Sequence, residues 1–207
     1  LVAKTRANPH IRLYLDTQVL SFTGSMGNFI TIVNSKEEKT SIEHGAAVLA
    51  TGAKEYKPLE YLYGEHPDVL THLDMDAAIR DNDPRIKGSS VVVFIQCVGS
   101  RNEENPFCSK ICCTHSLKSA IALKQLDPKK RVYVAYRDIR SYGFRETLYQ
   151  KARQLGVLFF RYDLERQPKL RKNSNQELEF SMMDHVLGMP VMIHPDLVVL
   201  ASGIVPA

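Results

Sequence analysis

The segments SSVVVFIQ (89–96), RVYVAY (131–136) and VLFFRY (157–162) decide the fold of this chain. Each is short, apolar and rich in β-branched or aromatic residues, which is typical of strands buried on both faces. Helices are expected between them, from about Ser109 to Leu126 and from about Phe144 to Leu155. This alternation predicts an α/β fold: a Rossmann-like three-layer unit with a parallel sheet and right-handed crossovers.

Antiparallel strands are expected on both sides of this unit. The segments IRLYL, TQVLSF, NFITIV and AAVLAT, between Ile11 and Thr51, alternate like strands and are joined by turns too short for parallel pairing, which predicts a β meander. LERQPKL, LEFSMMD and PVMIH, after Tyr162, resemble an antiparallel flap, and DLVVLASG (196–203) reads as a final buried strand. The polar stretch 58–88 reads as a connection with one short helix, Met75–Arg80, capped by Asp74.

Composition excludes several classes of function. The 207 residues are 44% hydrophobic and 24% charged with a net charge of +4, as in ordinary globular proteins. The single compact basic run, 129–131, lacks interleaved aromatic residues, so no nucleic-acid partner is expected. No apolar run approaches the ~20 residues of a membrane span, and the first residues lack the apolar core of a signal peptide, so a cytoplasmic protein is expected. Because the chain starts without methionine, we expect an internal fragment of a longer protein.

All four cysteines gather beside the first predicted strand and helix: Cys97, Cys108, Cys112 and Cys113. Thiolates are the ligands of iron–sulfur clusters and of structural zinc, and four thiolates complete either site. The N-terminus of the expected helix would stabilise negative charge there. Two further possibilities stay open: thiol–disulfide exchange between Cys108 and Cys112, and four inert thiols. Zinc ranks below iron–sulfur because its paired C-x-x-C knuckles are missing.

The loop CVGSRN (97–102) stands where a dinucleotide-binding unit has G-x-G-x-x-G. Cys97 replaces the first glycine, Gly99 matches the second and Asn102 replaces the third. The cradle for the pyrophosphate is therefore not expected, which disfavours a nicotinamide dinucleotide at this loop.

Several segments together resemble one family. CVGSR, CSKICC and YRDIRSYG, lying between LATGA and LASGIVP, are similar to the A subunit of heterodisulfide reductases, a flavoprotein built on a thioredoxin-reductase-like frame. The resemblance implies a Rossmann-like domain inserted into an FAD domain. On this basis the domains are residues 1–57, the end of the first FAD half; 58–88, a connection; 89–195, the inserted domain; and 196–207, the return to the FAD domain.

The resemblance also implies cofactors and partners. In the full-length protein, FAD would lie near Thr51, Gly52, Ala53 and Gly203, and a [4Fe-4S] cluster would be bound by Cys97, Cys108, Cys112 and Cys113. The function implied is electron transfer between FAD, this cluster and partner iron–sulfur subunits of a heterodisulfide reductase-like complex, with a ferredoxin or hydrogenase-type donor.

Three further hypotheses accompany this interpretation. Lys118, five residues beyond Cys113, could approach the flavin ring and stabilise its reduced anion, although a solvated lysine on a helix surface is the simpler interpretation. The alternative functions are an NAD(P)H-dependent disulfide reductase that uses a cysteine pair, and an interaction domain stapled by zinc.

Overall fold

The computed structural model describes residues 1–36, 38–185 and 188–206, and the chain forms two compact units, residues 1–51 and 52–207. Residue 207, the end of the last predicted segment, lies outside the described residues. The second unit is longer than the predicted inserted domain, because it also includes the connection and the final strand. The assignment of these segments to the domains of a longer flavoprotein stays a prediction.

The first unit contains a short helix, α1 (Val2–Ala7), and the predicted antiparallel meander, in the strand order β1-β2-β3. Its strands are β1 (Thr17–Ser25), β2 (Asn28–Ser35) and β3 (Glu38–His44). The prediction was wrong at both ends, since IRLYL and AAVLAT form no strand, while the polar segment EKTSIEH does. That segment forms a strand because it pairs with β2 at seven positions, although its polar composition does not favour a strand.

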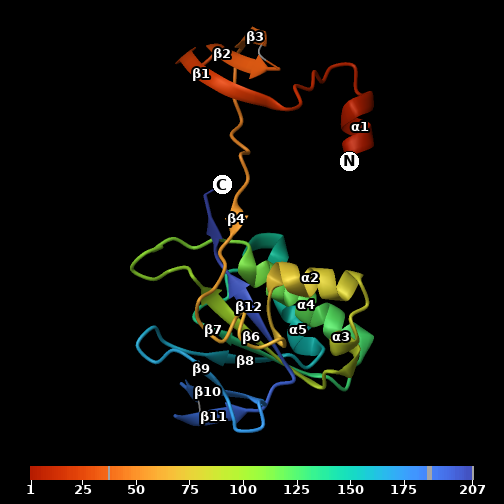
Figure 1. Ribbon diagram of the computed structural model, residues 1–207, viewed down its shortest axis with the longest axis vertical. Helices are drawn as coiled ribbons and strands as arrows, with labels where there is room; N and C mark the ends of the chain where they lie inside the picture. Colours follow the sequence, from red (N-terminus) through yellow and green to blue (C-terminus); the bar gives the residue numbers. More distant parts are fainter. Residues whose placement is uncertain (37, 186–187, 207) are drawn as a thin grey trace. The chain divides into compact units, whose positions relative to one another are not determined.

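A five-stranded sheet, entirely parallel and in the order β5-β12-β6-β7-β8, forms the centre of the second unit (Figure 1). Its strands are β5 (Val69–Thr71), β12 (Leu197–Ser202), β6 (Val91–Val98), β7 (Arg131–Tyr136) and β8 (Leu158–Arg161). The predicted strands β6, β7 and β8 are confirmed. β5 was not predicted, because three residues inside a polar stretch give no periodic signal, and the sequence did not indicate that β12 would separate β5 from β6.

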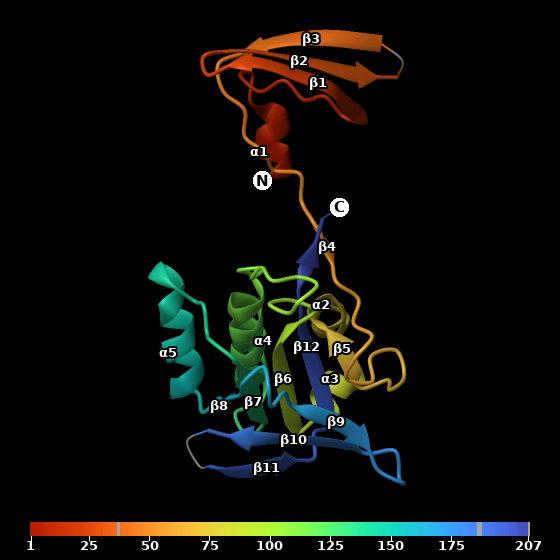
Figure 2. The same ribbon diagram turned by 90° about the vertical axis from the view of Figure 1, so that its left-hand side faces the viewer.

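Helices cover one face of the parallel sheet and an antiparallel sheet covers the other (Figure 2). The helices are α2 (His72–Arg80), α3 (Pro84–Gly88), α4 (Cys112–Leu126) and α5 (Glu146–Gln154), the last preceded by the 3₁₀ turn η1 (Gly143–Arg145). The flap is confirmed as β9 (Lys169–Lys172), β10 (Leu178–Asp184) and β11 (Met189–Ile193), in the order β11-β10-β9. The unit is thus the predicted three-layer α/β fold, with strands as its third layer.

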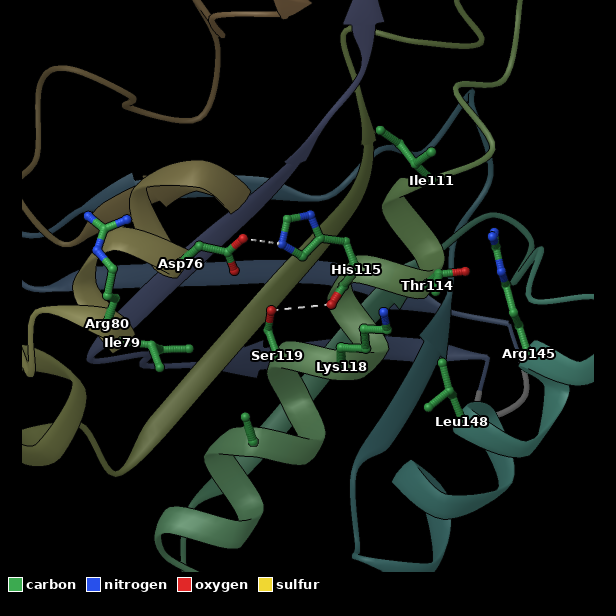
Figure 3. A pocket seen from close by; sticks show the side chains of 11 residues that line it. Asp76, Ile79, Arg80, Ile111, Thr114, His115, Lys118, Ser119, Arg145 and Leu148 are labelled. Atoms are coloured by element: carbon green, nitrogen blue, oxygen red, sulfur yellow. Dashed lines mark hydrogen bonds and ion pairs between the residues drawn. The ribbon is translucent and has the colours of Figure 1, made fainter. Parts of the chain in front are cut away.

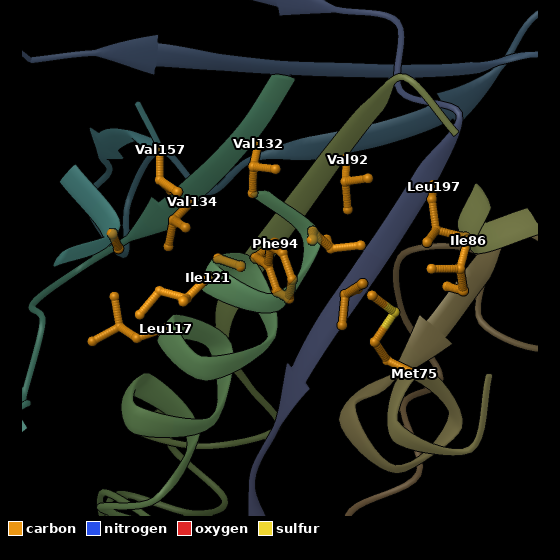
Figure 4. Close-up of a cluster of buried hydrophobic side chains, with 14 of the residues drawn as sticks. Met75, Ile86, Val92, Phe94, Leu117, Ile121, Val132, Val134, Val157 and Leu197 are labelled. Atoms are coloured by element: carbon orange, nitrogen blue, oxygen red, sulfur yellow. The ribbon is translucent and has the colours of Figure 1, made fainter. Parts of the chain in front are cut away.

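Successive side chains of β6 point to opposite faces of the parallel sheet, so they contribute to two separate hydrophobic clusters. Val92 and Phe94 lie in the cluster under the helices, where Leu117 and Ile121 of α4 join them (Figure 4). Val93 and Ile95 belong to the cluster on the flap side, with Phe180. Nearly all of β6 and all of β12 are buried, which explains why their sequences read as continuous apolar runs.

The starts of α2 and α4 differ from the sequence prediction by three residues each. Helix α2 begins at His72 with Thr71 as its N-cap, and Asp74 is the reciprocal partner in a capping box rather than the cap itself. Helix α4 begins at Cys112, three residues later than expected, because Lys110 adopts a left-handed backbone conformation (φ +60°) that a helix cannot contain. No helix among the described residues has both the length and the apolar character to cross a membrane.

Candidate functional site

The carboxyl ends of the parallel strands meet at one edge of the sheet, where open α/β folds bind their ligands. Cys97 lies there at the end of β6, and Gly203 follows β12, its neighbour in the sheet. The loop from Gly99 to Ile111 leads from this edge to Cys112 and Cys113, the first two residues of α4. Cys108 lies within this loop, four residues before the first residue of α4.

The backbone at Cys97 supports the comparison with a glycine loop. Cys97 has φ +63°, a left-handed conformation that glycine adopts freely and that costs other residues about 1–2 kcal/mol. Arg101 and Lys110 share this conformation, with φ +59° and +60°. Strain of this kind persists where the surrounding structure enforces it, often at functional sites.

Two glycines hold the loop tightly against neighbouring segments. A Cβ on Gly99 would lie 2.0 Å from the Tyr56 ring, and one on Gly203 would lie 3.0 Å from the Gly99 carbonyl oxygen. Gly203 N–H donates to the Val98 carbonyl oxygen (2.8 Å), and Ile204 N–H donates to Ser109 Oγ (2.9 Å). The cysteine loop is thereby fixed to the end of β12.

The four cysteines are free thiols. Cys112 and Cys113 are buried, whereas Cys97 and Cys108 are half-buried. Burial raises the pKa of Cys112 to about 12, and negative charge on any of the other three cysteines would raise it further. Burial also raises the pKa of Cys97 and of Cys113.

Polar groups of the cysteine loop and of the segment after β7 contact two of these thiols. Arg101 Nη1 donates to Cys97 Sγ (3.8 Å), and its Nη2 donates to Asp138 Oδ2 (2.7 Å). Cys113 Sγ donates to the Asp138 carbonyl oxygen (3.7 Å), so Asp138 connects two cysteines from different elements. Arg137 Nη1 donates to the Arg101 carbonyl oxygen (2.8 Å). The positive charges of Arg101 and Arg137 oppose the rise in the pKa of Cys97.

The donor set matches the chemistry of an iron–sulfur site, with four thiols and N–H groups directed at sulfur, including Lys110 N–H to Cys108 Sγ (3.4 Å). Among the described residues, however, no three cysteine, histidine or acidic side chains are arranged to hold a metal ion as they stand. The thiols are neighbours without forming a coordination shell.

The other predicted site residues lie in varied surroundings. Thr51 ends the first compact unit, while Gly52 and Ala53 begin the second, and all three are exposed. Gly203 is buried beside the cysteine loop. Lys118 is exposed and lines a cleft between α2, α4 and α5 to which none of the four cysteines contributes.

Sequence reasoning missed Arg101, Ser109 and Asp138. A usable signal existed for two of them: Arg101 follows the CVGS turn directly, and Asp138 lies just beyond the carboxyl end of a predicted strand. The contact between Ser109 and Ile204 joins residues 95 positions apart, and no local pattern predicts it.

Close in sequence to Cys97 and Cys113, the side chains of Gln96 and Ser116 form a buried hydrogen-bonded group with His72. His72 Nε2 contacts Ser116 Oγ (2.7 Å), and Gln96 Nε2 donates to the same oxygen (2.6 Å). The His72 ring stacks on His115 with centroids 4.3 Å apart, and burial lowers the pKa of His72 to about 3. This histidine is therefore neutral across the physiological pH range.

Curated proteins similar to this chain carry related names. The A subunit of the "H(2)/formate:CoB-CoM heterodisulfide,ferredoxin reductase" of Methanococcus maripaludis is 35% identical over 190 residues, covering 83% of this chain and 28% of the relative. The iron-sulfur A subunit of the "CoB--CoM heterodisulfide reductase" of Methanocaldococcus jannaschii is 36% identical over 191 residues, covering 84% and 28%. The chain thus spans little more than a quarter of the length of these relatives.

No protein-family model matches the chain. Among solved structures, L-lysine 6-monooxygenase from Pseudomonas syringae matches with a TM-score of 0.54 and 11% identity, over 98% of this chain and 55% of that protein. At this level of identity the likeness concerns the fold alone.

Proposed function

Because the chain is homologous to a segment of the A subunit of heterodisulfide reductases, we propose that it forms part of an oxidoreductase that passes electrons between FAD and a [4Fe-4S] cluster. The observation that carries the proposal is the gathering of all four cysteines, as free thiols, at the carboxyl edge of the parallel sheet. Cysteines used only to fill a core would be distributed over the apolar segments.

Cys97, Cys108, Cys112 and Cys113 would hold the cluster, which when bound supplies a one-electron carrier. The chain's own residues prepare the thiols for this role. Arg101 supplies a positive charge and an N–H group to Cys97, and the first turn of α4 supplies backbone N–H groups without helical partners beside Cys112 and Cys113. Both effects stabilise thiolates over thiols and so oppose the burial that raises their pKa values.

FAD would be bound by the longer protein. We propose that Thr51, Gly52 and Ala53 and, after β12, Gly203 belong to its flavin-binding segments, with residues 89–195 as a domain inserted between FAD-binding parts. The position of Gly203 directly after β12, at the carboxyl edge of the parallel sheet, supports this assignment, because open α/β folds bind their ligands at that edge. The partners would be iron–sulfur subunits of a heterodisulfide reductase-like complex and a ferredoxin or hydrogenase-type donor, with the disulfide chemistry carried out by a partner.

The decisive experiment is iron and acid-labile sulfide analysis of anaerobically purified intact protein, together with its visible absorbance. We expect the unmodified protein to be brown. The variants Cys108→Ser and Cys112→Ser should contain less iron and sulfide, by the amount that one cluster holds. Ser119→Ala is the matched control, because Ser119 is buried on the same helix and donates only to the His115 carbonyl oxygen. Colourless protein with a full complement of zinc would refute the cluster and favour the zinc-stapled interaction domain.

A pyridine-nucleotide-dependent disulfide reductase would require a reactive thiolate pair. The rise in the pKa of Cys112 to about 12 does not favour this function, because the thiolate is the attacking species. Anaerobic titration with NADPH distinguishes the two functions: rapid bleaching of the flavin, abolished by Cys112→Ser, would replace our proposal.

The hypothesis that Lys118 stabilises a reduced flavin has its own test. Lys118→Met should lower the flavin potential of the intact protein if the ammonium group lies near the ring. An unchanged potential would leave Lys118 as an ordinary exposed lysine of the cleft.

A further inference from the structure

A ribbon of two short antiparallel strands, β4 (Lys54–Glu55) and β13 (Ile204–Val205), adjoins the carboxyl end of β12. Three of the proposed flavin-binding residues flank this ribbon, since Gly52 and Ala53 precede β4 and Gly203 precedes β13. Two strands of two residues each are too short to be stable alone. Contacts with other elements must therefore hold the ribbon in place.

One set of contacts joins the ribbon to the cysteine loop. Ile204 N–H donates to Ser109 Oγ (2.9 Å), and the Tyr56 ring lies against Gly99. Tyr56 N–H donates to the Gly203 carbonyl oxygen (2.9 Å), which extends the pairing of the two strands by one hydrogen bond. The position of the ribbon therefore determines where the Tyr56 ring meets the loop.

Glu55 provides a second attachment, to the start of α2. Its Oε2 accepts hydrogen bonds from Thr71 Oγ1 (3.0 Å) and Lys57 Nζ (2.8 Å), and its Oε1 accepts one from Leu73 N–H (3.3 Å). The Glu55 side chain is only 10% exposed. Leu73 is the second residue of α2, where N–H groups lack partners within the helix and a negative charge is favourable. Glu55 thus links β4 to a helix that begins 17 positions later in the chain.

The Thr71 hydroxyl is available to Glu55 although Thr71 also caps α2. This hydroxyl is buried and has a single hydrogen, and its oxygen lies 2.9 Å from Asp74 Oδ2 and 3.0 Å from Glu55 Oε2. Asp74 Oδ2 accepts two other hydrogen bonds, from Thr71 N–H (2.9 Å) and from Tyr63 O–H (3.0 Å). The hydroxyl can therefore donate to Glu55 without leaving Asp74 unsatisfied.

Helix α2 is itself fixed against the helix that carries two of the cysteines. Met75 is fully buried in the hydrophobic cluster under the helices, and Asp76 pairs with His115 of α4 (2.9 Å), as Figure 3 shows. Helix α4 begins with Cys112 and Cys113. By contacting α2, Glu55 therefore holds β4 in a fixed position relative to the cysteines.

We propose that Glu55 is a positioning residue, which anchors the ribbon so that the flavin-binding segments next to its two strands keep their place beside the cysteine loop. Glu55 acts through Thr71 and Leu73 rather than through a contact with flavin. The inference rests on the proposed function, because that function assigns flavin binding to the residues that flank the ribbon. The reach of the Glu55 side chain matters for this role, whereas its charge is secondary.

Two substitutions in the intact protein, prepared without flavin, separate reach from charge. The amide of Glu55→Gln can accept from Leu73 N–H and donate to Thr71 Oγ1, whose hydrogen then turns to Asp74, so its FAD affinity should stay within about threefold of the unmodified value. Glu55→Asp keeps the charge but is one methylene shorter and loses these contacts, so its FAD affinity should fall at least about tenfold. Glu65→Asp is the matched control, because Glu65 is an exposed glutamate outside the ribbon and its substitution should not change the affinity.

Hydrogen exchange of the flavin-free protein, followed by mass spectrometry, gives a readout that does not depend on flavin. In Glu55→Asp, the amides of residues 54–57 should exchange at least about tenfold faster, while those of β6 stay as protected as before. The proposal is overturned if Glu55→Asp binds FAD as tightly as the unmodified protein, or if Glu55→Gln loses as much affinity as Glu55→Asp.

The exchange rates also separate this role from a general one. Faster exchange throughout β6 in Glu55→Asp would show that Glu55 supports the whole fold, and unchanged exchange at residues 54–57 would show that it does not anchor the ribbon. Either result would overturn the proposal. An unmodified protein that binds no FAD would instead refute the electron-transfer proposal, and the exchange rates would still decide whether Glu55 anchors the ribbon.

Discussion

Helix α4 has two sides that behave differently. On the thiol side, defined by the four cysteines with Gly99, Arg101 and Asp138, the thiols are half-buried or buried and hydrogen bonds and close backbone contacts fix the loop. On the cleft side, defined by Thr114, His115 and Lys118, the helix borders an open space with unmatched cations. Lys118 lies five positions after Cys113, so the two side chains leave the helix in directions about 140° apart. Proximity in sequence therefore does not place Lys118 among the cysteines.

The largest effect is expected from Gly99→Ala on the thiol side. The new Cβ would clash with the Tyr56 ring in a backbone conformation of φ +65°, so we expect a loss of about 2–4 kcal/mol in the free energy of unfolding, measured with urea. Gly143→Ala is the control, because its φ is +64° but no atom lies within 4 Å; it should cost only about 1 kcal/mol. Equal losses would show that the loop is not held by this packing.

His72 stacks on His115 of the cleft side, and its buried, neutral ring predicts that the protein is less stable in acid. The unfolded chain binds a proton at this residue below about pH 6.5, whereas the folded protein does so only near pH 3. The free energy of unfolding should therefore decrease as the pH falls through this window, by about 1.4 kcal/mol per unit from this group.

Urea unfolding at pH 6 and pH 4 measures this contribution. His72→Gln should show a smaller decrease between the two values than the unmodified protein, while His10→Gln, an exposed control in the first unit, should not. A decrease of the same size in all three proteins would contradict a neutral His72.

A smaller loss in the free energy of unfolding is expected when the carboxylate of Asp138, which contacts Arg101, is removed. Asp138→Asn removes the charge that Arg101 Nη2 contacts at 2.7 Å, and we expect a loss of about 1 kcal/mol, because the Arg101 side chain is only 15% exposed. Asp81→Asn tests an exposed pair at 2.9 Å, Arg80–Asp81, and should change stability by less than about 0.5 kcal/mol. Thermal unfolding of both variants in parallel makes the comparison.

The smallest effect is expected on the cleft side. Lys118→Met replaces an exposed side chain without an ion-pair partner among the described residues, so the free energy of unfolding should change by less than about 0.5 kcal/mol. A loss above about 1 kcal/mol in the same urea titration would mean that Lys118 supports the fold and that the two sides of α4 are less different than the geometry indicates.

The sequence by itself determined the elements whose patterns are local. The apolar runs of β6, β7 and β8 and the spacing between them were sufficient to predict a parallel α/β unit, because nearly continuous apolar runs are typical of parallel strands, although β8, at the edge of the sheet, contains no buried residue. Clustering in sequence was also sufficient to place the four cysteines within one loop and at its two ends, since the end of β6, the loop and the first turn of α4 are contiguous.

Only the tertiary structure decided what depends on partners distant in the chain. β5 is a strand because β12 pairs with it, AAVLAT is not one because it pairs with none of the described strands, and α4 starts at Cys112 because the backbone turns at Lys110. The contacts of Asp138 with the thiols and of Ser109 with Ile204 likewise arise from segments that meet at the edge of the sheet. Hydrogen bonding and packing between remote segments have no local sequence signal, and this is the physical reason why the two sides of α4 could be distinguished only in three dimensions.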